Sequence, residues 1–275
     1  MVNSMIKKGV QQGDIWKLGS HTLGCGSSLD KDFVDKVVGG VKIRCILTDP
    51  PYGIAYVEGT QGIKTKQRDM TEKIQGDQLQ TEDQYVAFTT AWLNPTKPFL
   101  DHYNACYIFN SDAQYPALRA GMKQAGFYYS QMIVWVKNTV VLGRKDYLPM
   151  HELIAYGWFG RHKMERSKAK SVMFHPKPAS SKLHPTQKPV ALLRKLIPNS
   201  TRTGDVIYDP FLGSGSTLVA AHHLGRKCIG IELDPSYCET VIARWEKLTG
   251  QQATQRAGDN SLLKRLDITT TLDKM

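Results

Sequence analysis

Short strand-like apolar runs alternate with helical stretches along almost the whole chain, and this alternation restricts the fold more than any other feature of the sequence. Strands are expected at 21–25, 43–48, 105–109, 131–136, 153–157, 205–209 and 228–232. Helices are expected at 81–93, 112–125, 190–197, 216–224 and 235–248. Strands and helices that alternate in this way build a sheet with helices packed against it, so the sequence predicts an α/β fold rather than a sandwich or a bundle.

The length and composition fit a globular protein with a substantial core. The chain has 275 residues, of which 41% are apolar, and we expect one domain over 15–250 with a tail over 251–275. No apolar run approaches the roughly 20 residues of a membrane span, and the first residues lack the hydrophobic core of a signal peptide. Five cysteines without a C-x-x-C pair argue against a disulfide framework and a zinc site. We therefore expect a cytoplasmic protein without a bound metal.

The positive charge of the chain is concentrated in one stretch. The formal net charge is +11, and residues 137–184 hold ten Lys and Arg against three Asp and Glu. Such a field attracts polyanions, although a run of charges is more often only a solvated surface. We expect 137–184 to be a basic insertion that contacts a polyanion such as nucleic acid.

An unusual turn follows the strand expected at 43–48. The strand stops at Asp49, and Pro50, Pro51 and Tyr52 come next. Proline has a fixed φ and no N–H, and a residue before proline is held extended. The chain therefore leaves the strand rigidly, with unpaired carbonyls and with Tyr52 held near Asp49. An edge turn with a capping Asp and an exposed Tyr is the plainer alternative.

A second turn, rich in glycine, follows the strand expected at 205–209. The sequence at 209–217 is DPFLGSGST. Gly213 and Gly215 allow close approach of a ligand, and Ser214 or Ser216 can cap the next helix, whose N–H groups form a positive end. We expect the ligand to meet the following residues of this turn: Asp209, Phe211, Gly213, Ser214, Gly215 and Ser216.

An acid at the end of the next strand indicates which ligand the turn receives. Glu232 lies 19 residues after Gly213, where a carboxylate can accept hydrogen bonds from both hydroxyls of a ribose. The dinucleotide motif would need glycine in place of Leu218, and the P-loop would need lysine in place of Ser216. A pyrophosphate is therefore disfavoured. Two acids suit a cofactor with a ribose and a positive charge, and S-adenosylmethionine has both.

The third motif, HPTQKP at 184–189, precedes an apolar helix. Pro189 suits a first helical turn, so Thr186, Gln187 and Lys188 lie where a helix N-terminus and a cation can receive a carboxylate. The methionine carboxylate of the cofactor is the expected partner, and simple helix capping is the alternative.

Together, DPPY at 49–52, DPFLGSGST at 209–217, IELD at 231–234 and HPTQKP at 184–189 resemble the β-class amino-methyltransferases of DNA, over about 15–250. The resemblance implies a Rossmann-like, S-adenosylmethionine-dependent sheet with helices on both faces and a circularly permuted motif order. The N-terminal segment around 21–28 must then supply the strand beside 228–232. Residues 135–158 are similar to methylases of phages and prophages, so the resemblance also implies a bacterial or phage-encoded protein.

One position departs from the pattern of this family. The family's N-terminal strand ends in Gly-Asp-Ser, whose Asp holds the adenine amino group of the cofactor, whereas this chain has Gly26-Ser27-Ser28. Ser27 can still form a hydrogen bond, but its side chain is shorter and neutral. This departure motivates an alternative from another class, a DNA-binding protein with a degenerate cofactor pocket.

The resemblance assigns roles to the catalytic turn. The Asp49 carboxylate and the Pro50 carbonyl would accept the hydrogens of a base amino group, Pro51 would keep the turn rigid, and Tyr52 would stack on the base. The target base must leave the double helix to reach them. Expected DNA contacts come from the basic stretch: Lys137, Asn138, Arg144, Lys145 and Tyr147.

The choice of base and of assembly stays open at this point. The hydrogen-bonding argument serves the N6 amine of adenine and the N4 amine of cytosine equally. Only the resemblance favours adenine, because the first motif residue is Asp49, and cytosine-N4 is the alternative. Members of this family often dimerise, so a homodimer is among the expected states. The resemblance also implies a role in restriction-modification, and whether a restriction enzyme is paired with this protein stays open.

Overall fold

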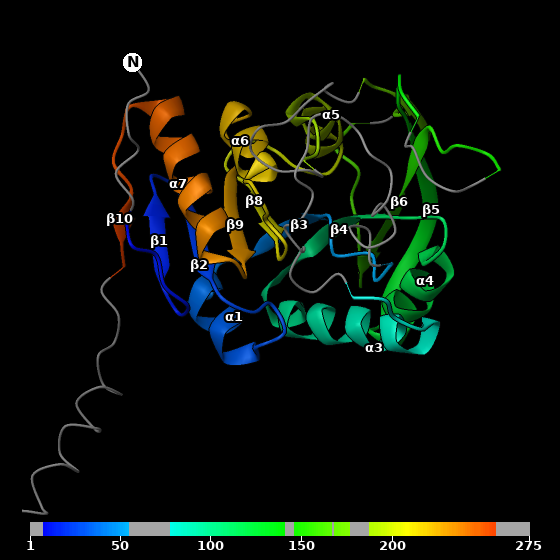
Figure 1. The fold of residues 1–275 in the computed structure, drawn as a ribbon, viewed down its shortest axis with the longest axis horizontal. Helices are drawn as coiled ribbons and strands as arrows, with labels where there is room; N and C mark the ends of the chain where they lie inside the picture. Colours follow the sequence, from blue (N-terminus) through cyan, green and yellow to red (C-terminus); the bar gives the residue numbers. More distant parts are fainter. Residues whose placement is uncertain (1–7, 55–77, 141–145, 167, 177–186, 257–275) are drawn as a thin grey trace, which may run out of the picture.

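The computed structural model describes residues 8–54, 78–140, 146–166, 168–176 and 187–256. Within these residues, ten strands form one mixed sheet that runs across the molecule (Figure 1). The strands are β1 Ile15–Leu18, β2 His21–Cys25, β3 Ile43–Thr48, β4 Leu100–Asn110, β5 Phe127–Val136, β6 His151–Phe159, β7 Val172–Phe174, β8 Val206–Asp209, β9 Lys227–Glu232 and β10 Thr254–Gln255. Their order in the sheet is β10-β1-β2-β9-β8-β3-β4-β6-β5-β7.

Helices cover both faces of the sheet, as expected for an α/β fold. They are α1 Lys31–Val38, α3 Glu82–Leu93, α4 Tyr115–Gln124, α5 Val190–Ser200, α6 Ser216–His223 and α7 Pro235–Thr249, with a 3-10 helix η1 at Asn94–Phe99. Figure 1 shows α1, α3 and α4 on one face and α5, α6 and α7 on the other. Each face has its own apolar cluster, one containing Leu196 and Trp245 and the other Phe33 and Trp92. None of these helices is long and apolar enough to cross a membrane.

Local sequence signals set the ends of the helices. Asp30 caps α1 by accepting hydrogen bonds from two backbone N–H groups, and Gly39 ends that helix with a φ of 61°, a conformation that glycine adopts without strain. Asp234 caps α7, and Pro235 fills its first position, where the missing N–H of proline costs nothing. These caps fix α1 beside β2 and α7 directly after β9.

The five central strands are parallel, so their carboxyl ends meet at one edge of the sheet. β2, β9, β8, β3 and β4 pair in this order. Cys25 at the end of β2 lies beside Glu232 at the end of β9. The N-terminal strand therefore completes the sheet next to a C-terminal strand, which confirms the permuted order. Asp49, Asp209 and Glu232 all lie at the edge where ligands bind in sheets of this kind.

The other half of the sheet is mostly antiparallel and includes part of the basic stretch 137–184. Strand β6 lies between β4 and β5 and pairs with both in antiparallel register. β7 then adds to β5 as a short parallel edge strand. The described part of this stretch is therefore built into the sheet through β6 and β7.

All seven expected strands and all five expected helices are present, with shifted ends. β4 is longer than the expected 105–109, and α4 begins at Tyr115 rather than at 112. The sequence interpretation missed β1, β7, β10 and α1. β10 lies in the stretch that we expected to be a tail. It pairs with β1, with Thr254 opposite Lys17. Residues 257–275 of that tail lie outside the described part of the chain.

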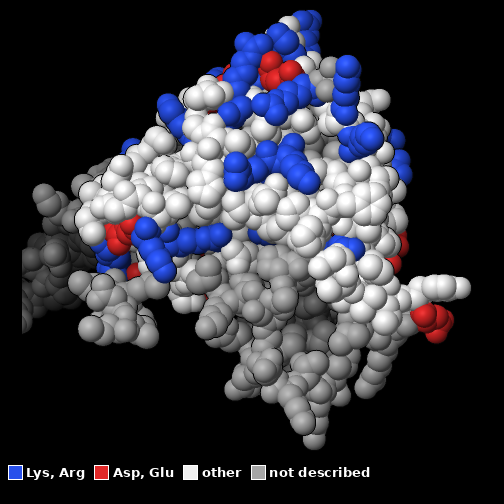
Figure 2. Space-filling model, turned by 90° about the horizontal axis from the view of Figure 1, so that it is seen from above, with Lys and Arg blue, Asp and Glu red and all other residues white. Residues whose placement is uncertain are grey.

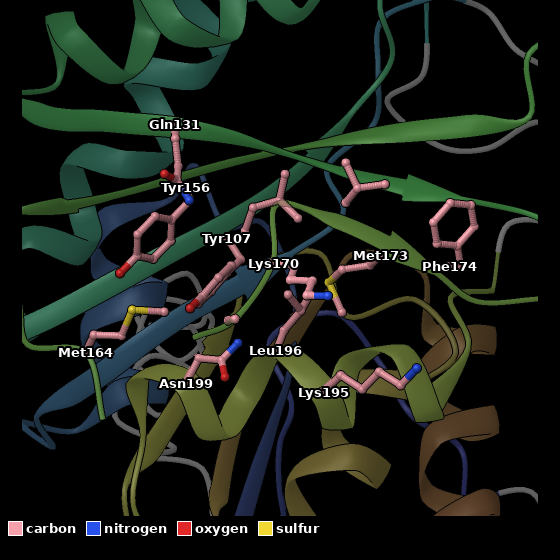
Figure 3. Close-up of a pocket in the computed structure, with 13 residues that line it drawn as sticks. Tyr107, Gln131, Tyr156, Met164, Lys170, Met173, Phe174, Lys195, Leu196 and Asn199 are labelled. Carbon is pink, nitrogen blue, oxygen red and sulfur yellow. The ribbon is translucent and has the colours of Figure 1, made fainter. Parts of the chain in front are cut away.

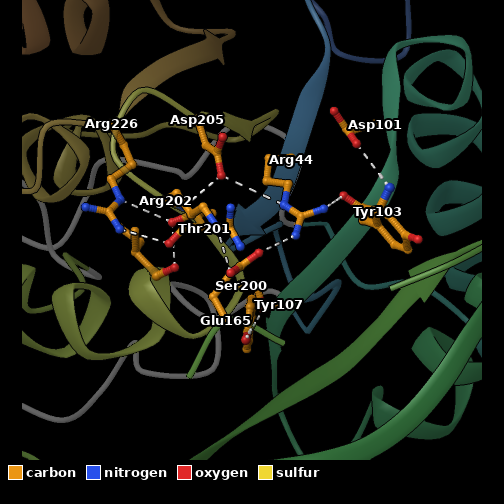
Figure 4. Close-up of polar contacts among 11 residues, drawn as sticks. Arg44, Asp101, Tyr103, Tyr107, Glu165, Ser200, Thr201, Arg202, Asp205 and Arg226 are labelled. Atoms are coloured by element: carbon orange, nitrogen blue, oxygen red, sulfur yellow. Dashed lines mark hydrogen bonds and ion pairs between the residues drawn. The ribbon is translucent and has the colours of Figure 1, made fainter. Parts of the chain in front are cut away.

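A network of ions ties the segment after β6 to the amino-terminal ends of the parallel strands (Figure 4). The Arg44 guanidinium of β3 lies 3.0 Å from the Glu165 carboxylate and 3.8 Å from that of Asp205. Glu165 also pairs with Arg202 at 2.8 Å, and Arg44 donates a hydrogen bond to the Tyr103 carbonyl. The network holds this segment at the edge of the sheet opposite Asp49.

Candidate active site

The turn after β3 is held by hydrogen bonds from several elements. The Tyr52 hydroxyl donates to Asp49 Oδ1 at 2.7 Å. The Pro51 carbonyl accepts a hydrogen bond from the Tyr85 hydroxyl of α3 at 3.2 Å, and Tyr85 in turn accepts one from the Asn110 amide at 2.9 Å. A turn that two prolines make rigid is thus fixed further by α3 and by the end of β4.

This turn carries two hydrogen-bond acceptors on adjacent residues, the half-buried Asp49 and the buried Pro50. The Asp49 side chain keeps 24% of its surface exposed. No described residue donates a hydrogen bond to the Pro50 carbonyl. A carboxylate and a carbonyl on adjacent residues can accept two hydrogens from one amino group.

Asp49 begins a buried chain of alternating charges. The Lys188 ammonium lies 2.5 Å from Asp49 Oδ2 and 3.0 Å from Glu152 Oε2. The other oxygen of Glu152, Oε1, lies 2.6 Å from the Lys137 ammonium. The two lysine side chains expose 8% and 2% of their surface. The charges of two carboxylates and two ammonium groups thus balance one another at a place where the side chains have little contact with solvent.

The charges of this chain shift each other's pKa. Burial raises the pKa of Asp49, and the Lys188 ammonium opposes that rise. Burial also acts to raise the pKa of Glu152, but Lys188 and Lys137 overcome it and bring this pKa to about 2. Burial and the neighbouring carboxylates raise the pKa of Tyr52 well above its ordinary value. Tyr52 is therefore a neutral hydrogen-bond donor to Asp49, and Glu152 is a permanent anion.

The glycine turn lies at the end of β8 and uses its acids differently. Glu232 Oε2 accepts a hydrogen bond from the Gly213 N–H at 2.7 Å, and Oε1 accepts one from the Asp234 N–H at 2.8 Å. Asp209 Oδ1 accepts hydrogen bonds from the Thr48 hydroxyl at 2.7 Å and from the Phe211 N–H at 3.1 Å. Neither acid forms a salt bridge with a described residue.

The Asp209 hydrogen bond joins the two turns, because Thr48 directly precedes Asp49. Asp209 is buried, and this burial raises the pKa of its carboxyl to about 6. The Phe211 ring packs edge-on against Trp92 at 5.6 Å. The N-terminal segment closes the site from the other side, since the Gly26 N–H donates to the Glu232 carbonyl at 2.8 Å and Ser27 follows at once.

Helix α6 begins without the serine cap that the sequence suggested. Gly215 is the N-terminal cap, with a φ of 81°, and no side chain caps the helix. A Cβ at Gly215 would approach Val241 to 3.1 Å, so the turn requires glycine for its conformation and for its space. Arg244 instead binds the Ser214 carbonyl at 2.9 Å and lies 3.5 Å from the Ser216 hydroxyl. The uncapped N–H groups of α6 form a positive end beside two acids.

The expected DNA contacts are placed unevenly. Tyr147 is 92% exposed, and Asn138 is also exposed. Lys137 is buried, and its pairing with Glu152 places it inside the protein rather than on a DNA surface. Arg144 and Lys145, like Thr186 of the third motif, lie outside the described residues. Figure 2 shows that Lys and Arg predominate over Asp and Glu on the face of the molecule seen from the side of α5, α6 and α7.

The sequence interpretation missed Glu152 as a site residue and gave Lys188 a different neighbour. Lys188 meets Asp49 of the catalytic turn, whereas the sequence led us to expect the cofactor carboxylate as its partner. No local pattern pointed to Glu152, because its partners come from two distant segments of the chain. The one sequence signal for this group of charges was the basic residue Lys188, two positions before the first residue of α5.

A pocket of about 340 Å³ lies away from the two turns, between α5 and the strands β4 to β7 (Figure 3). The Tyr107 and Tyr156 rings line it at a centroid distance of 4.9 Å, and Lys170 and Lys195 also line it. It shares no lining residue with the two turns. Among the described residues, no group of His, Cys, Asp and Glu could hold a metal ion.

Two curated bacterial proteins are similar to this chain along most of their length. The type II methyltransferase M.HpaI of Haemophilus parainfluenzae is 26% identical over 229 residues, which cover 74% of this chain and 68% of that protein. The type II methyltransferase M2.DpnII of Streptococcus pneumoniae is 28% identical over 233 residues, 73% of this chain and 81% of that protein.

Solved structures share the fold. A complex of M1.HpyAVI with SAM matches with a TM-score of 0.59 at 23% identity, over 81% of this chain and 98% of that one. The cytosine-N4-specific PvuII DNA methyltransferase matches with a TM-score of 0.62 at 16% identity, over 91% of each chain. The DNA methylase family, N6_N4_Mtase, matches residues 43–243, and that match includes both turns. The chain belongs to this family of DNA methylases.

Proposed function

We propose that this protein transfers a methyl group from S-adenosylmethionine to the N6 amine of adenine in double-stranded DNA. The observation that carries the proposal is the pair of acceptors at Asp49 and Pro50, placed beside two acids, Asp209 and Glu232, that form no salt bridge with a described residue. The match of residues 43–243 to the DNA methylase family supports DNA as the substrate.

The acceptor pair suits the chemistry of a base amine. The lone pair of an exocyclic amine is delocalised into the ring, so the amine is a poor nucleophile. The Asp49 carboxylate and the Pro50 carbonyl would hold its two hydrogens and favour a tetrahedral nitrogen whose lone pair points away from the ring. Tyr52 would stack on the base and fix its plane. The protein then acts by positioning and by electrostatic stabilisation of the positive nitrogen.

The glycine turn fits S-adenosylmethionine, which supplies an electrophilic methyl on a sulfonium. Glu232 keeps lone pairs for the ribose hydroxyls although both of its oxygens accept backbone hydrogen bonds. The charges of Asp209 and Glu232, which no described cation pairs, favour a cationic ligand, and the open N-terminus of α6 favours a carboxylate. Ser27 and Phe211 flank this space, with Ser27 beside β9 and Phe211 against α3. Solved neighbours in complex with SAM come from M1.HpyAVI and from the Thermus thermophilus protein TTHA0409.

The DNA must present the target base outside the helix, because a stacked base cannot reach Asp49. We propose that the segment 138–147 contacts the DNA through Asn138, Arg144, Lys145 and Tyr147. Both curated relatives are named type II methyltransferases, which supports a role in restriction-modification in a bacterium or phage.

Cytosine-N4 is the second candidate, because the PvuII enzyme with the same fold is specific for it. The acceptor pair serves both amines. We favour adenine because the first residue of the catalytic motif is aspartate in this chain.

The test is transfer of labelled methyl from S-adenosylmethionine to unmethylated bacterial DNA, followed by identification of the modified nucleoside. We expect label in N6-methyladenosine. Asp49→Ala should remove it, whereas Asp32→Ala, at an exposed position of α1, should not. Label in N4-methylcytidine would select the second candidate. DNA binding without transfer would contradict the proposed activity and favour a binding protein with a degenerate cofactor pocket.

A further inference from the structure

We propose that Lys188 and Glu152 are positioning residues for Asp49, with Lys188 holding the carboxylate oxygen Oδ2 and Glu152 holding Lys188. The other oxygen, Oδ1, then faces the target amine. This inference rests on the proposed function, and it assigns to the reaction a glutamate and a lysine from outside the catalytic motif.

The distances show how Asp49 is oriented. Lys188 lies 2.5 Å from Oδ2, and the Tyr52 hydroxyl lies 2.7 Å from Oδ1. Lys188 is the more firmly fixed of these two partners, because its ammonium forms ion pairs with both Asp49 and Glu152, at 2.5 and 3.0 Å, whereas the Tyr52 hydroxyl is neutral and lies 3.3 Å from Glu152. An incoming amine can therefore replace the Tyr52 hydroxyl at Oδ1 while Lys188 keeps the carboxylate in its plane.

Glu152 is needed because a lysine side chain is long and flexible. One carboxylate would hold the ammonium at a single point, whereas Asp49 and Glu152 hold it between two. Lys137 completes the arrangement by pairing with the second oxygen of Glu152 at 2.6 Å. The four charges alternate in sign and therefore balance. Asp49 and Glu152 without the two lysines would be two neighbouring negative charges that repel each other.

The same geometry separates this role from cofactor binding. The three N–H donors of the Lys188 ammonium are taken up by Asp49, by Glu152 and, at 3.3 Å, by the Tyr52 hydroxyl, so Lys188 could bind the cofactor carboxylate only by giving up one of these contacts. A cofactor ligand, when removed, raises the KM for S-adenosylmethionine. A positioning residue for Asp49, when removed, lowers kcat and leaves that KM unchanged.

The experiment compares Lys188→Met, Lys188→Arg and Glu152→Gln with the wild-type enzyme in steady-state methyl transfer across pH. Lys123→Met, at an exposed position of α4, is the matched control for loss of one lysine. We expect Lys188→Met to lower kcat about 10²-fold, with the KM for S-adenosylmethionine unchanged. Its rate should rise with pH through the neutral range, because Asp49 without its cation holds a proton more tightly. Lys188→Arg and Glu152→Gln should lie between this variant and the wild type.

A second arm does not depend on activity. The unfolding free energies of Lys188→Met, Asp49→Asn and the double variant form a cycle. We expect the double variant to lose less unfolding free energy than the two single variants lose together. Lys188→Met leaves the Asp49 carboxylate without its cation, and Asp49→Asn removes that unpaired charge. Lys188→Gln, which also removes the charge but keeps a polar side chain, replaces Lys188→Met in the cycle if the latter does not fold.

The outcomes separate the two proposals. A raised KM with unchanged kcat in Lys188→Met would return Lys188 to the cofactor, and additive free energies in the cycle would overturn the contact with Asp49. A wild-type enzyme that transfers no methyl would overturn the proposed function alone, and the cycle would still decide whether Lys188 holds Asp49.

Discussion

The two turns at the carboxyl edge of the sheet both carry buried or half-buried acids, but they stabilise them in different ways. After β3, Asp49 is paired with a lysine, and the neighbouring Glu152 is paired with two. After β8 and β9, Asp209 and Glu232 are satisfied by hydroxyl and backbone N–H groups. A hydrogen bond from Thr48 to Asp209 joins these regions.

The difference indicates what each turn is built to receive. Ion pairs neutralise the first turn and fix its carboxylate, which suits a neutral amine that needs an oriented acceptor. Hydrogen bonds leave the charge of the second turn in place, which suits a cationic ligand such as a sulfonium. Two ligands of different charge can then meet at one edge of the sheet, each beside the electrostatic environment that it requires.

The largest expected effect is on stability at the first turn. Glu152→Gln leaves Lys137 buried without its anion, and loss of one partner of a buried ion pair costs about 4 kcal/mol. We expect a decrease of this size in the free energy of unfolding measured with urea. Adding Lys137→Met should restore much of it, because the unpaired cation is then gone. If the two changes simply add, Lys137 does not depend on Glu152.

Asp209→Asn tests whether the second turn holds a charge at a cost in stability. The folded-state pKa of Asp209, about 6, is above the ordinary value of an aspartate. The folded protein therefore binds the proton more tightly than the unfolded chain, and the stability falls as the pH rises from about 4 to about 6. The amide oxygen of the introduced asparagine can still accept both hydrogen bonds. The variant should be more stable by about 3 kcal/mol at neutral pH.

The matching control for this prediction is the pH dependence itself. Thermal unfolding across a range from about pH 4 to about pH 7 should show a decline in the wild type that is smaller in Asp209→Asn. Equal slopes in the two proteins would contradict a raised pKa at Asp209. The KM for S-adenosylmethionine should rise in the variant, because the charge that favours a sulfonium is lost.

Glu232→Gln should affect ligand binding more than stability. The amide oxygen can accept one of the two backbone hydrogen bonds, and no buried cation among the described residues is left unpaired. Loss of a charged acceptor for ribose hydroxyls weakens binding by about tenfold. We expect this change in the dissociation constant for S-adenosylmethionine by calorimetry, while kcat at saturation stays close to that of the wild type. A fall in kcat with unchanged affinity would place Glu232 with the first turn instead.

The contrast also explains how far the sequence could predict the site. Asp49 and Gly213 belong to motifs whose residues lie next to one another in the chain, so local rules located both turns. The partnership of Lys137 with Glu152 depends on the antiparallel register of β5 and β6, in which Val136 lies opposite His151. No local rule fixes that register. β1 and β10 were missed for a similar reason, since strands of four and two residues owe their structure to their neighbours more than to their own sequence.

The smallest expected effect comes from removal of the Tyr52 hydroxyl, which occupies Asp49 Oδ1. Tyr52→Phe keeps the ring for stacking and removes the hydrogen bond to Asp49 Oδ1. The target amine then finds Oδ1 free, but Asp49 loses a neutral donor that helps to keep it ionised. These effects oppose each other, and a single hydrogen bond contributes about 1 kcal/mol, so we expect kcat at neutral pH to change by less than about fivefold. The rate should fall more steeply than in the wild type as the pH is lowered, because only Lys188 then keeps Asp49 charged. A loss as large as that of Asp49→Ala would show that the Tyr52 hydroxyl takes part in the reaction itself, and the first turn would then need its hydroxyl as well as its ion pairs.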